Sequence, residues 1–381
     1  MEIEIGKLIK KAKLIRCGDG EYPVLSMTMH DGLMFQNDRF KKQIASVDQS
    51  QYQVVQRHQL VESFPIDEGV LAVQELTDAG IVSPAYKIWD VDMEKVVPKY
   101  LEFALRAPKS IEYYKFKLRG TTARRRSIPD AEFCAMRIKC PSLDEQKIIV
   151  DTIEKTKRVI DSRNLELDTL DDLIKARFVE MFGDENNSKK WDIVNVEEVA
   201  DVQVGVVIKP SQYYTDESNG IRAFRSLNIG EGFIKNNDWV YFTEEGHQKN
   251  SKSILKENDL LIVRSGAPGT ACVVTEEYVG SNAIDIIIAH PDCEKVNPCY
   301  LCTFTNMPHG KKQIEEGTGG AAQQHFNVGK YNKLQLMMPP KALQDEFVEF
   351  VHQVDKSKLL VQKSLDETQM LFNSLMQKYF G

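Results

Sequence analysis

The feature that most constrains this chain is an internal repeat at an offset of about 200 residues. Residues 98–101 (Pro-Lys-Tyr-Leu) correspond to residues 298–301 (Pro-Cys-Tyr-Leu). Further along, the offset falls to about 198, so that residues 180–183 correspond to residues 378–381. A period this long is not that of a solenoid, whose repeats are roughly 20–50 residues. The 381 residues therefore predict two copies of one unit, each a globular domain followed by a long helix.

Each copy ends in a segment with the pattern of a long helix. Pro141 in the first copy and Pro339/Pro340 in the second mark the starts, because proline is favoured in the first turn of a helix. Apolar residues then recur at steps of three and four, which is the pattern of a coiled-coil seam. The seam residues are Ile149, Ile153, Ile160, Leu167, Leu170 and Ile174 in the first helix, and Phe347, Val351, Val354, Val361, Leu365 and Phe372 in the second.

Two such helices in one chain pack most simply on each other. An antiparallel pair would place the two globular domains at opposite ends, related by a pseudo-twofold axis. The competing interpretation is that each helix pairs with another chain. Two polar seam residues, Arg163 and Lys358, fit either arrangement, since polar seam residues set register and partner choice.

The globular part of each copy is predicted to be α+β. Apolar runs at residues 260–263 and 284–288 have the length of buried strands, and residues 98–105 are predicted to form a helix. We divide the chain into a first domain (1–140), a first helix (141–183), a second domain (184–338) and a second helix (339–381). Two similar domains would thus each be followed by a long helix.

Composition excludes several classes of protein. The sequence has no apolar run of the ~18 residues that a membrane span needs and no secretory signal. Seven scattered cysteines favour reduced thiols, so we expect a cytoplasmic protein. The net charge of −7 argues mildly against nucleic acid, but residues 1–140 carry 22 Lys+Arg against 19 Asp+Glu, a net +3.

The positive charge is concentrated in one segment of the first domain. Six basic residues fall within twelve positions that contain no acid, and these are Lys115, Lys117, Arg119, Arg124, Arg125 and Arg126. Such a segment favours contact with phosphates, even on an acidic protein, because distant charges are screened by salt. A solvated loop is the alternative.

The motifs of common catalytic and cofactor sites are missing from the sequence. It contains no P-loop, no dinucleotide-binding glycine motif, no zinc-protease motif and no Asn/Asp-Pro-Pro-aromatic tetrapeptide of amino-methyltransferases. Cys299 and Cys302 form one CxxC pair, which is weak support for zinc. The matching positions of the first copy are Lys99 and Glu102, so the shared fold contains no metal site. We therefore expect Cys299 and Cys302 to be buried, reduced thiols. We predict no catalytic residue, cofactor or metal.

In the second copy, polar residues of the types that read base edges lie beside predicted strands and after the glycine-rich run, where the first copy has Arg124, Arg125 and Arg126. Arg, Asn and Gln make bidentate hydrogen bonds to bases. The candidates are Arg222, Arg225, Asn228, Arg264, Gln323 and Gln324. Surface salt bridges and ordinary loop variation explain them equally well.

Through its repeated domains, long helices and several short motifs, the chain resembles the DNA-specificity (S) subunits of type I restriction–modification enzymes. Residues 258–266 (Asn-Asp-Leu-Leu-Ile-Val-Arg-Ser-Gly) and 143–146 (Leu-Asp-Glu-Gln) are similar to motifs of that family, as are the glycine-rich run at 317–321 and Phe182-Gly183 at a helix end. Residues 343–346 (Leu-Gln-Asp-Glu) depart from the expected Glu-Gln, and the first domain departs more.

The resemblance implies a function without catalysis. Two target-recognition domains would each read one half of a bipartite site in double-stranded DNA, and the paired helices would act as a spacer. DNA adenine methyltransferase (M) subunits and ATP-dependent restriction (R) subunits would be the partners. Two rivals are a coiled-coil scaffold that does not touch DNA and a fragment of a fused type IIG-like methyltransferase/nuclease.

Overall fold

The computed structural model describes residues 2–29, 32–39, 49–119, 126–318 and 326–381. The chain divides into two compact units. The first contains residues 1–165 and 362–381, and the second contains residues 166–361. Each unit therefore combines one globular domain with half of each long helix. The division of the chain into four consecutive segments stays a proposal.

The first unit is built around a four-stranded antiparallel sheet with the strand order β2-β9-β6-β7. Two-stranded ladders join β1 with β10, β3 with β4 and β5 with β8. Its elements, with α5 extending into the second unit, are β1 (Glu2–Glu4), β2 (Ile9–Lys11), β3 (Leu25–Met27), β4 (Leu33–Phe35), α1 (Gln36–Arg39), β5 (Gln53–Gln56), β6 (Leu60–Glu62), β7 (Leu71–Val73), β8 (Ala79–Val82), β9 (Lys87–Val91), α2 (Pro98–Arg106), α3 (Pro108–Lys117), α4 (Asp130–Ala135), β10 (Arg137–Lys139) and α5 (Leu143–Phe182).

The second unit repeats this plan with the strand order β12-β19-β16-β17, and β11 pairs with β20. It adds a second four-stranded sheet, β13-β15-β14-β18. Its elements, with α10 extending into the first unit, are β11 (Asp192–Asn195), β12 (Ala200–Val204), β13 (Tyr214–Thr215), β14 (Ile221–Phe224), β15 (Val240–Phe242), α6 (Glu244–Lys249), β16 (Leu260–Val263), β17 (Ala271–Val273), β18 (Asn282–Ala283), β19 (Ile286–Pro291), α7 (Pro298–Asn306), α8 (Pro308–Thr318), α9 (Val328–Asn332), β20 (Gln335–Met338) and α10 (Lys341–Phe380).

Equivalent side chains make equivalent contacts in the two copies. The hydroxyl of Tyr100 donates to the carbonyl of Lys139 at 3.0 Å, and that of Tyr300 donates to the carbonyl of Met337 at 2.7 Å. These pairs reproduce the offset of 200 before the slip and 198 after it. The duplication predicted from the sequence is confirmed, and so is the α+β class.

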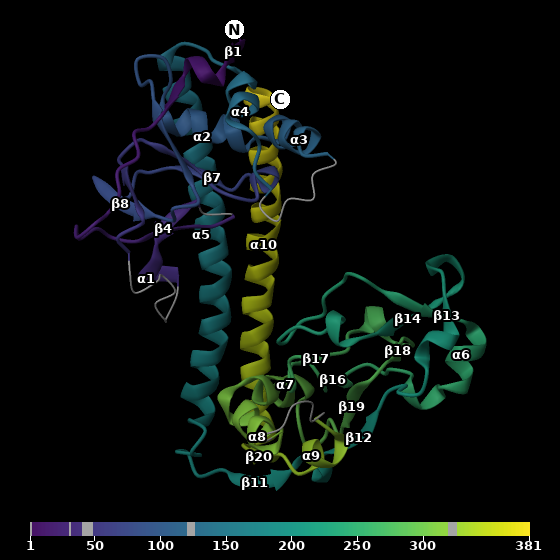
Figure 1. Ribbon diagram of the computed structural model, residues 1–381. Helices are drawn as coiled ribbons and strands as arrows, with labels where there is room; N and C mark the ends of the chain where they lie inside the picture. Colours follow the sequence, from purple (N-terminus) through teal and green to yellow (C-terminus); the bar gives the residue numbers. More distant parts are fainter. Residues whose placement is uncertain (1, 30–31, 40–48, 120–125, 319–325) are drawn as a thin grey trace. The chain divides into compact units, whose positions relative to one another are not determined.

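The long helices pair in antiparallel fashion within each unit, where α5 and α10 lie side by side (Figure 1). In the first unit, Ile149 and Ile153 near the start of α5 share a core with Met376 and Phe380 near the end of α10. The second unit has the reciprocal arrangement, in which Phe178 and Phe182 at the end of α5 share a core with Phe347 and Val351 of α10.

All twelve apolar seam residues named from the sequence are buried or half-buried. The polar seam residue Lys358 forms an ion pair with Asp171 of α5 at 2.5 Å, which adds a specific contact to the helix pairing in the second unit. The seam also extends beyond the predicted positions, because Phe178, Phe182, Met376 and Phe380 are buried. The aromatic rings of Phe182 and Tyr300 lie 4.8 Å apart, and those of Phe380 and Tyr100 lie 5.2 Å apart.

Some predicted boundaries were wrong in detail. The prolines precede the long helices, which begin at Leu143 and Lys341. The strand expected at residues 284–288 is β19 (Ile286–Pro291), because Asp285 has a left-handed backbone (φ 48°) that breaks the run. In the described residues, no helix is long and apolar enough to cross a membrane.

Candidate nucleic-acid interface

The basic segment of the first domain begins in α3 and continues past its end. Lys115 and Arg119 are exposed, and neither forms an ion pair with any carboxylate in the described part of the chain. The guanidinium of Arg119 lies 5.4 Å from the ring centroid of Phe116, a side chain that is itself 60% exposed. These two cations are therefore available to an anionic partner.

The other described cations of this segment already have partners. Lys117 forms an ion pair with Glu132 and lies over the ring of Tyr113. Arg126 contacts Asp67 at 2.9 Å and also forms an ion pair with Glu68. Its backbone carbonyl accepts a hydrogen bond from the N–H of Ile66 at 2.9 Å, so Arg126 anchors the chain where the segment ends. Arg124 and Arg125 lie outside the described residues.

In the second domain, Arg222 is held by aromatic rings. Its guanidinium lies 5.6 Å from the centroid of Trp239 and 5.7 Å from that of Tyr278, and these two rings stack on each other. Glu277 lies 3.5 Å away. The side chain is 35% exposed. The ring contacts restrict the guanidinium, and one of its nitrogens donates to Glu277, so Arg222 presents an oriented guanidinium with only part of its donor set left for a partner.

Arg225 and Asn228, by contrast, stabilise their own loop. Asn228 is fully buried, accepting from the N–H of Arg225 at 2.9 Å and donating to the carbonyl of Asn237 at 2.6 Å. The guanidinium of Arg225 donates to the carbonyl of Asp238. The expectation that Asn228 faces a base disagrees with this burial, and the physical reason is that its amide satisfies backbone groups of the loop.

Arg264 also has an internal role. It forms an ion pair with Asp285 and donates to the carbonyl of Phe326 at 3.2 Å, with its side chain only 16% exposed. Arg264 therefore joins the strand β16 to two loops. Gln323 and Gln324 lie outside the described residues.

One basic stretch was missed by the sequence reasoning. Lys10 and Lys13 are exposed on and just after β2, and Arg16 is exposed and donates to the carbonyl of Gln51 at 3.0 Å. The signal was present, since residues 5–18 contain five basic residues and no acid.

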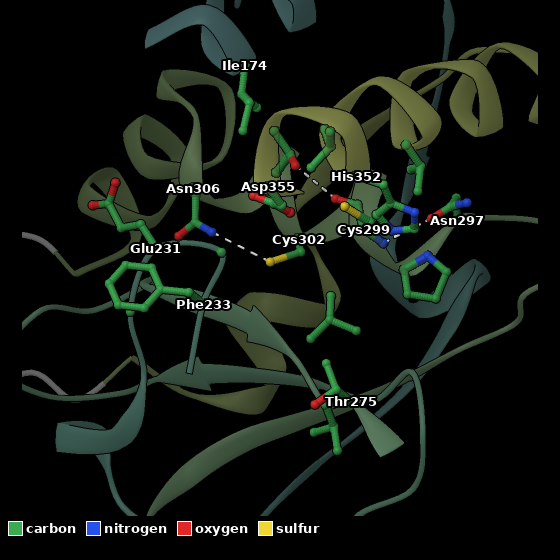
Figure 2. Close-up of a pocket in the computed structure, with 18 of the residues that line it drawn as sticks. Ile174, Glu231, Phe233, Thr275, Asn297, Cys299, Cys302, Asn306, His352 and Asp355 are labelled. Atoms are coloured by element: carbon green, nitrogen blue, oxygen red, sulfur yellow. Dashed lines mark hydrogen bonds between the residues drawn. The ribbon is translucent and has the colours of Figure 1, made fainter. Parts of the chain in front are cut away.

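The second unit contains a cavity of about 920 Å³ between α7, α10, β17 and the loop at residues 230–235 (Figure 2). Its walls include Cys299, Cys302 and Asn306 of α7. In the first copy the equivalent positions are Lys99, Glu102 and Arg106, and Glu102 forms ion pairs with the other two. Short side chains have replaced long charged ones, which leaves the space open.

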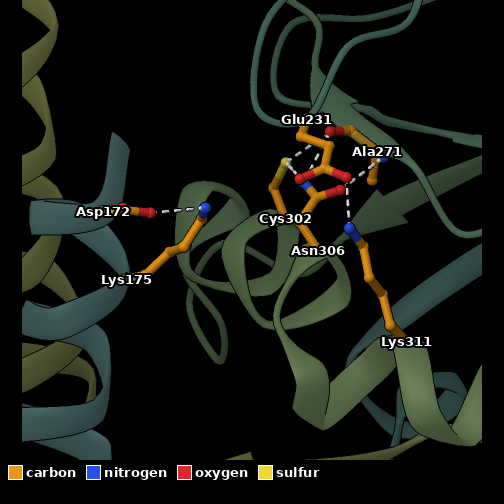
Figure 3. A network of polar contacts seen from close by, with 7 residues as sticks. All are labelled: Asp172, Lys175, Glu231, Ala271, Cys302, Asn306 and Lys311. Carbon is orange, nitrogen blue, oxygen red and sulfur yellow. Dashed lines mark hydrogen bonds and ion pairs between the residues drawn. The ribbon is translucent and has the colours of Figure 1, made fainter. Parts of the chain in front are cut away.

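A polar network borders this cavity (Figure 3). The amide of Asn306 donates to the carbonyl of Ala271 at 2.8 Å and accepts from its N–H at 3.0 Å, so it fixes β17 on α7. Glu231 forms an ion pair with Lys311. Burial raises the pKa of the Cys299 thiol to about 12 and that of Cys302 well above its usual range, so both stay protonated at neutral pH.

The described residues contain no group of three or more His, Cys, Asp and Glu that could hold a metal ion. The cavity therefore offers neither a thiolate nor a metal cluster among those residues. Two copies of one α+β domain, each packed with ends of both long helices, define a class of duplicated two-domain proteins.

Comparison with known proteins agrees with this class. Residues 188–368 match the family model described as "Type I restriction modification DNA specificity domain". These residues cover nearly all of the second domain and most of α10. The resemblance to the specificity subunits of type I restriction–modification enzymes, noted from sequence motifs, is therefore confirmed.

One relative is the type I restriction enzyme MjaVIII specificity subunit of Methanocaldococcus jannaschii. It is 25% identical over 179 residues, which are 43% of this chain and 40% of the relative. The match thus spans less than half of that relative's length.

Two solved structures share the fold over all of this chain. A chain from the "Structural basis underlying complex assembly and conformational transition of the type I R-M system" has a TM-score of 0.59, 15% identity and 97% of its own length covered. The "Type-I restriction-modification system S subunit from M. genitalium" has a TM-score of 0.56, 13% identity and 96% covered.

The structure also changes how the Leu-x-Glu-Gln motif is aligned with the start of the second long helix. Gln146 and Gln344 are both fully buried at the start of a long helix and make the same contacts, so they are equivalent. The second copy therefore keeps the glutamine of the Leu-x-Glu-Gln motif and departs from it at Lys341 and Leu343, where the first copy has Leu143 and Glu145.

Proposed function

We propose that this chain is the DNA sequence-specificity subunit of a type I restriction–modification complex and has no catalytic activity of its own. Each recognition domain reads one half of a bipartite site in double-stranded DNA, and the paired helices set the separation of the halves. The observation that carries the proposal is the duplicated unit, whose two copies keep the same sheet order but present different exposed side chains.

The exposed cations divide by geometry into two roles. Lys115 and Arg119 suit contacts to phosphates, since they are exposed and have no carboxylate partner in the described residues. Arg222 suits base readout, because a fixed guanidinium fork matches the acceptors of guanine. Arg126 and Arg264 act by holding loops, while Arg124, Arg125, Gln323 and Gln324 remain proposals from the sequence.

The long helices carry exposed apolar side chains that support docking of methyltransferase subunits. In the second unit Leu359 and Leu360 are 72% and 71% exposed, and in the first unit Leu165 and Met370 are exposed to a similar degree. Large aliphatic residues on a helix surface are typical of an interface with another protein. ATP-dependent restriction subunits would then join the assembly.

The decisive experiment is mapping methylated adenines in cells that express this chain together with methyltransferase subunits. The expected result is one bipartite motif with a fixed non-specific spacer. Cells that express the methyltransferase subunits alone are the control. A methylome without a bipartite motif, from an assembled and folded complex, would contradict the proposal and favour a scaffold.

A further inference from the structure

The loop after β12 presents an aliphatic tip to solvent. Ile208 is 79% exposed, the highest value among the large hydrophobic side chains of the described residues, and its neighbour Val207 is 49% exposed. Lys209 follows and is also exposed. Exposing two branched aliphatic side chains to water is unfavourable in the free protein, so the arrangement points to a partner that buries them.

The tip is held rigidly from below. The N–H of Val206 donates to the carbonyl of Ala283 at 2.8 Å, and its carbonyl accepts from the N–H of Asp285 at 3.1 Å. Asp285 in turn forms the ion pair with Arg264.

The far side of the tip is equally constrained. Lys209 has a left-handed backbone (φ 45°), which is uncommon for a residue with a side chain, and Pro210 fixes the next turn. A rigid mount is what an inserted side chain requires, because little ordering entropy is lost on binding.

The first copy has a comparable feature. The chain that leaves β2, the counterpart of β12, exposes Leu14 (55%) and Ile15 (46%) between Lys13 and Arg16. The two segments have unlike sequences, but both place an exposed aliphatic pair beside basic residues just after the first strand of the main sheet.

We propose that the Val207–Ile208 tip is a wedge that enters a DNA groove, with Ile208 against a base-pair step and Lys209 on the adjacent phosphate. This inference rests on the proposed function and names the residue that deforms the target. The charge decides between partners, since Lys13 and Arg16 flank the aliphatic pair in the first copy and Lys209 directly follows it in the second. Proteins that insert apolar wedges between base steps use this combination of aliphatic tip and cationic flank.

The test uses the full chain assembled with its methyltransferase subunits and a duplex that carries the mapped recognition site. 2-Aminopurine is placed at successive steps of the second half-site to report unstacking. We expect Ile208→Ala to weaken binding roughly five- to fifty-fold, because several buried apolar carbons are lost. The fluorescence increase at one step should disappear with it, and Ile208→Leu should restore both.

Val279→Ala is the matched control, because Val279 is 49% exposed in the same domain without a basic neighbour in sequence. It should bind as the wild type does. Assembly of each variant with methyltransferase subunits is measured by size-exclusion chromatography, and its thermal midpoint should be unchanged.

The outcomes separate the wedge from its alternatives. Unchanged DNA binding by Ile208→Ala overturns the wedge, as does weaker binding without any change of fluorescence at any step. Loss of assembly with methyltransferase subunits would assign the tip to a protein interface and also overturns it. A wild-type complex that binds no duplex specifically overturns the proposed function and the wedge together, whereas specific wild-type binding leaves the proposed function standing.

Discussion

The side-chain carbonyl of Gln146 accepts a hydrogen bond from the backbone N–H of Val97 at 2.8 Å. Its amide donates to the carbonyl of Pro141 at 2.9 Å, so a single buried glutamine joins the start of α5 to the N-terminus of α2. Gln344 makes the matching bonds to Asn297 and Pro339. The junction of domain and helix is thus built in the same way twice.

Replacing Gln146 with Leu should destabilise the protein by roughly 1–3 kcal/mol, because it leaves the half-buried N–H of Val97 without its side-chain acceptor. The measurement is the midpoint of denaturant unfolding. Gln353→Leu is the control, since Gln353 is exposed on α10 and should change stability by less than about 0.5 kcal/mol. Equal effects of the two substitutions would show that the hydrogen bond between Gln146 and Val97 does not stabilise the protein.

Truncating Phe380 should destabilise the domain of the other copy. Its ring packs on Tyr100 of the first domain, so Phe380→Ala should cost about 3–5 kcal/mol there. Hydrogen exchange should show lost protection in α2 before any loss in α7. Phe116→Ala, at an exposed position, is the control. Loss of hydrogen-exchange protection in α7 before α2 would contradict the packing of Phe380 on the first domain.

The stability of the first unit should depend on pH through Glu62. Burial raises the pKa of this carboxyl, although Lys87 at 3.0 Å opposes the shift. A carboxyl with a raised folded-state pKa gives a contribution that is complete below the unfolded pKa and is lost as pH rises through the folded pKa. Wild-type stability relative to Glu62→Gln should therefore fall as pH rises from about 4.5.

Unfolding free energies of the two proteins, measured side by side across this range, test the sign. Because only Glu62 differs, the difference between the curves isolates its titration from that of the other carboxyls. A difference that grows in favour of the wild type with rising pH would show that the attraction to Lys87 outweighs burial.

Arg119 and Arg126 should behave differently although both belong to the basic segment. Arg119→Ala should weaken DNA binding by the assembled complex on all sequences and lower the salt slope by about 0.9, the value for one phosphate contact. Arg126→Ala should mainly lower stability, since its guanidinium pairs with Asp67 and Glu68. An unchanged salt slope for Arg119→Ala would show that Arg119 faces solvent and does not contact a phosphate.

The helices should set the spacing of the half-sites. Inserting four residues after Asp161 in α5 and at the matching position, after Leu359, in α10 adds about 6 Å of helix and keeps the seam nearly in register. The spacer in the methylome should grow by one or two base pairs, with both half-sites unchanged. An active variant that still methylates sites with the original spacer length would show that the helices do not set the spacing.

The sequence was informative where signals are local or periodic. The helix pair follows from apolar residues at steps of three and four, and the duplication follows from a constant offset. It could not show which cations are engaged, because Arg126 meets Asp67 from 59 positions away and Arg264 meets Asp285 from 21 positions away. Asn228 was misassigned for the same reason, since its burial depends on the fold of the whole loop.

The reciprocal packing of Phe182 on Tyr300 and of Phe380 on Tyr100 has a consequence for the origin of the chain. Neither copy completes its own core, because each borrows the end of the helix that belongs to the other. Two identical half-length chains could therefore complete each other's cores as a homodimer. A fusion of two such chains would leave the side chains of the two domains free to diverge without any change in the architecture.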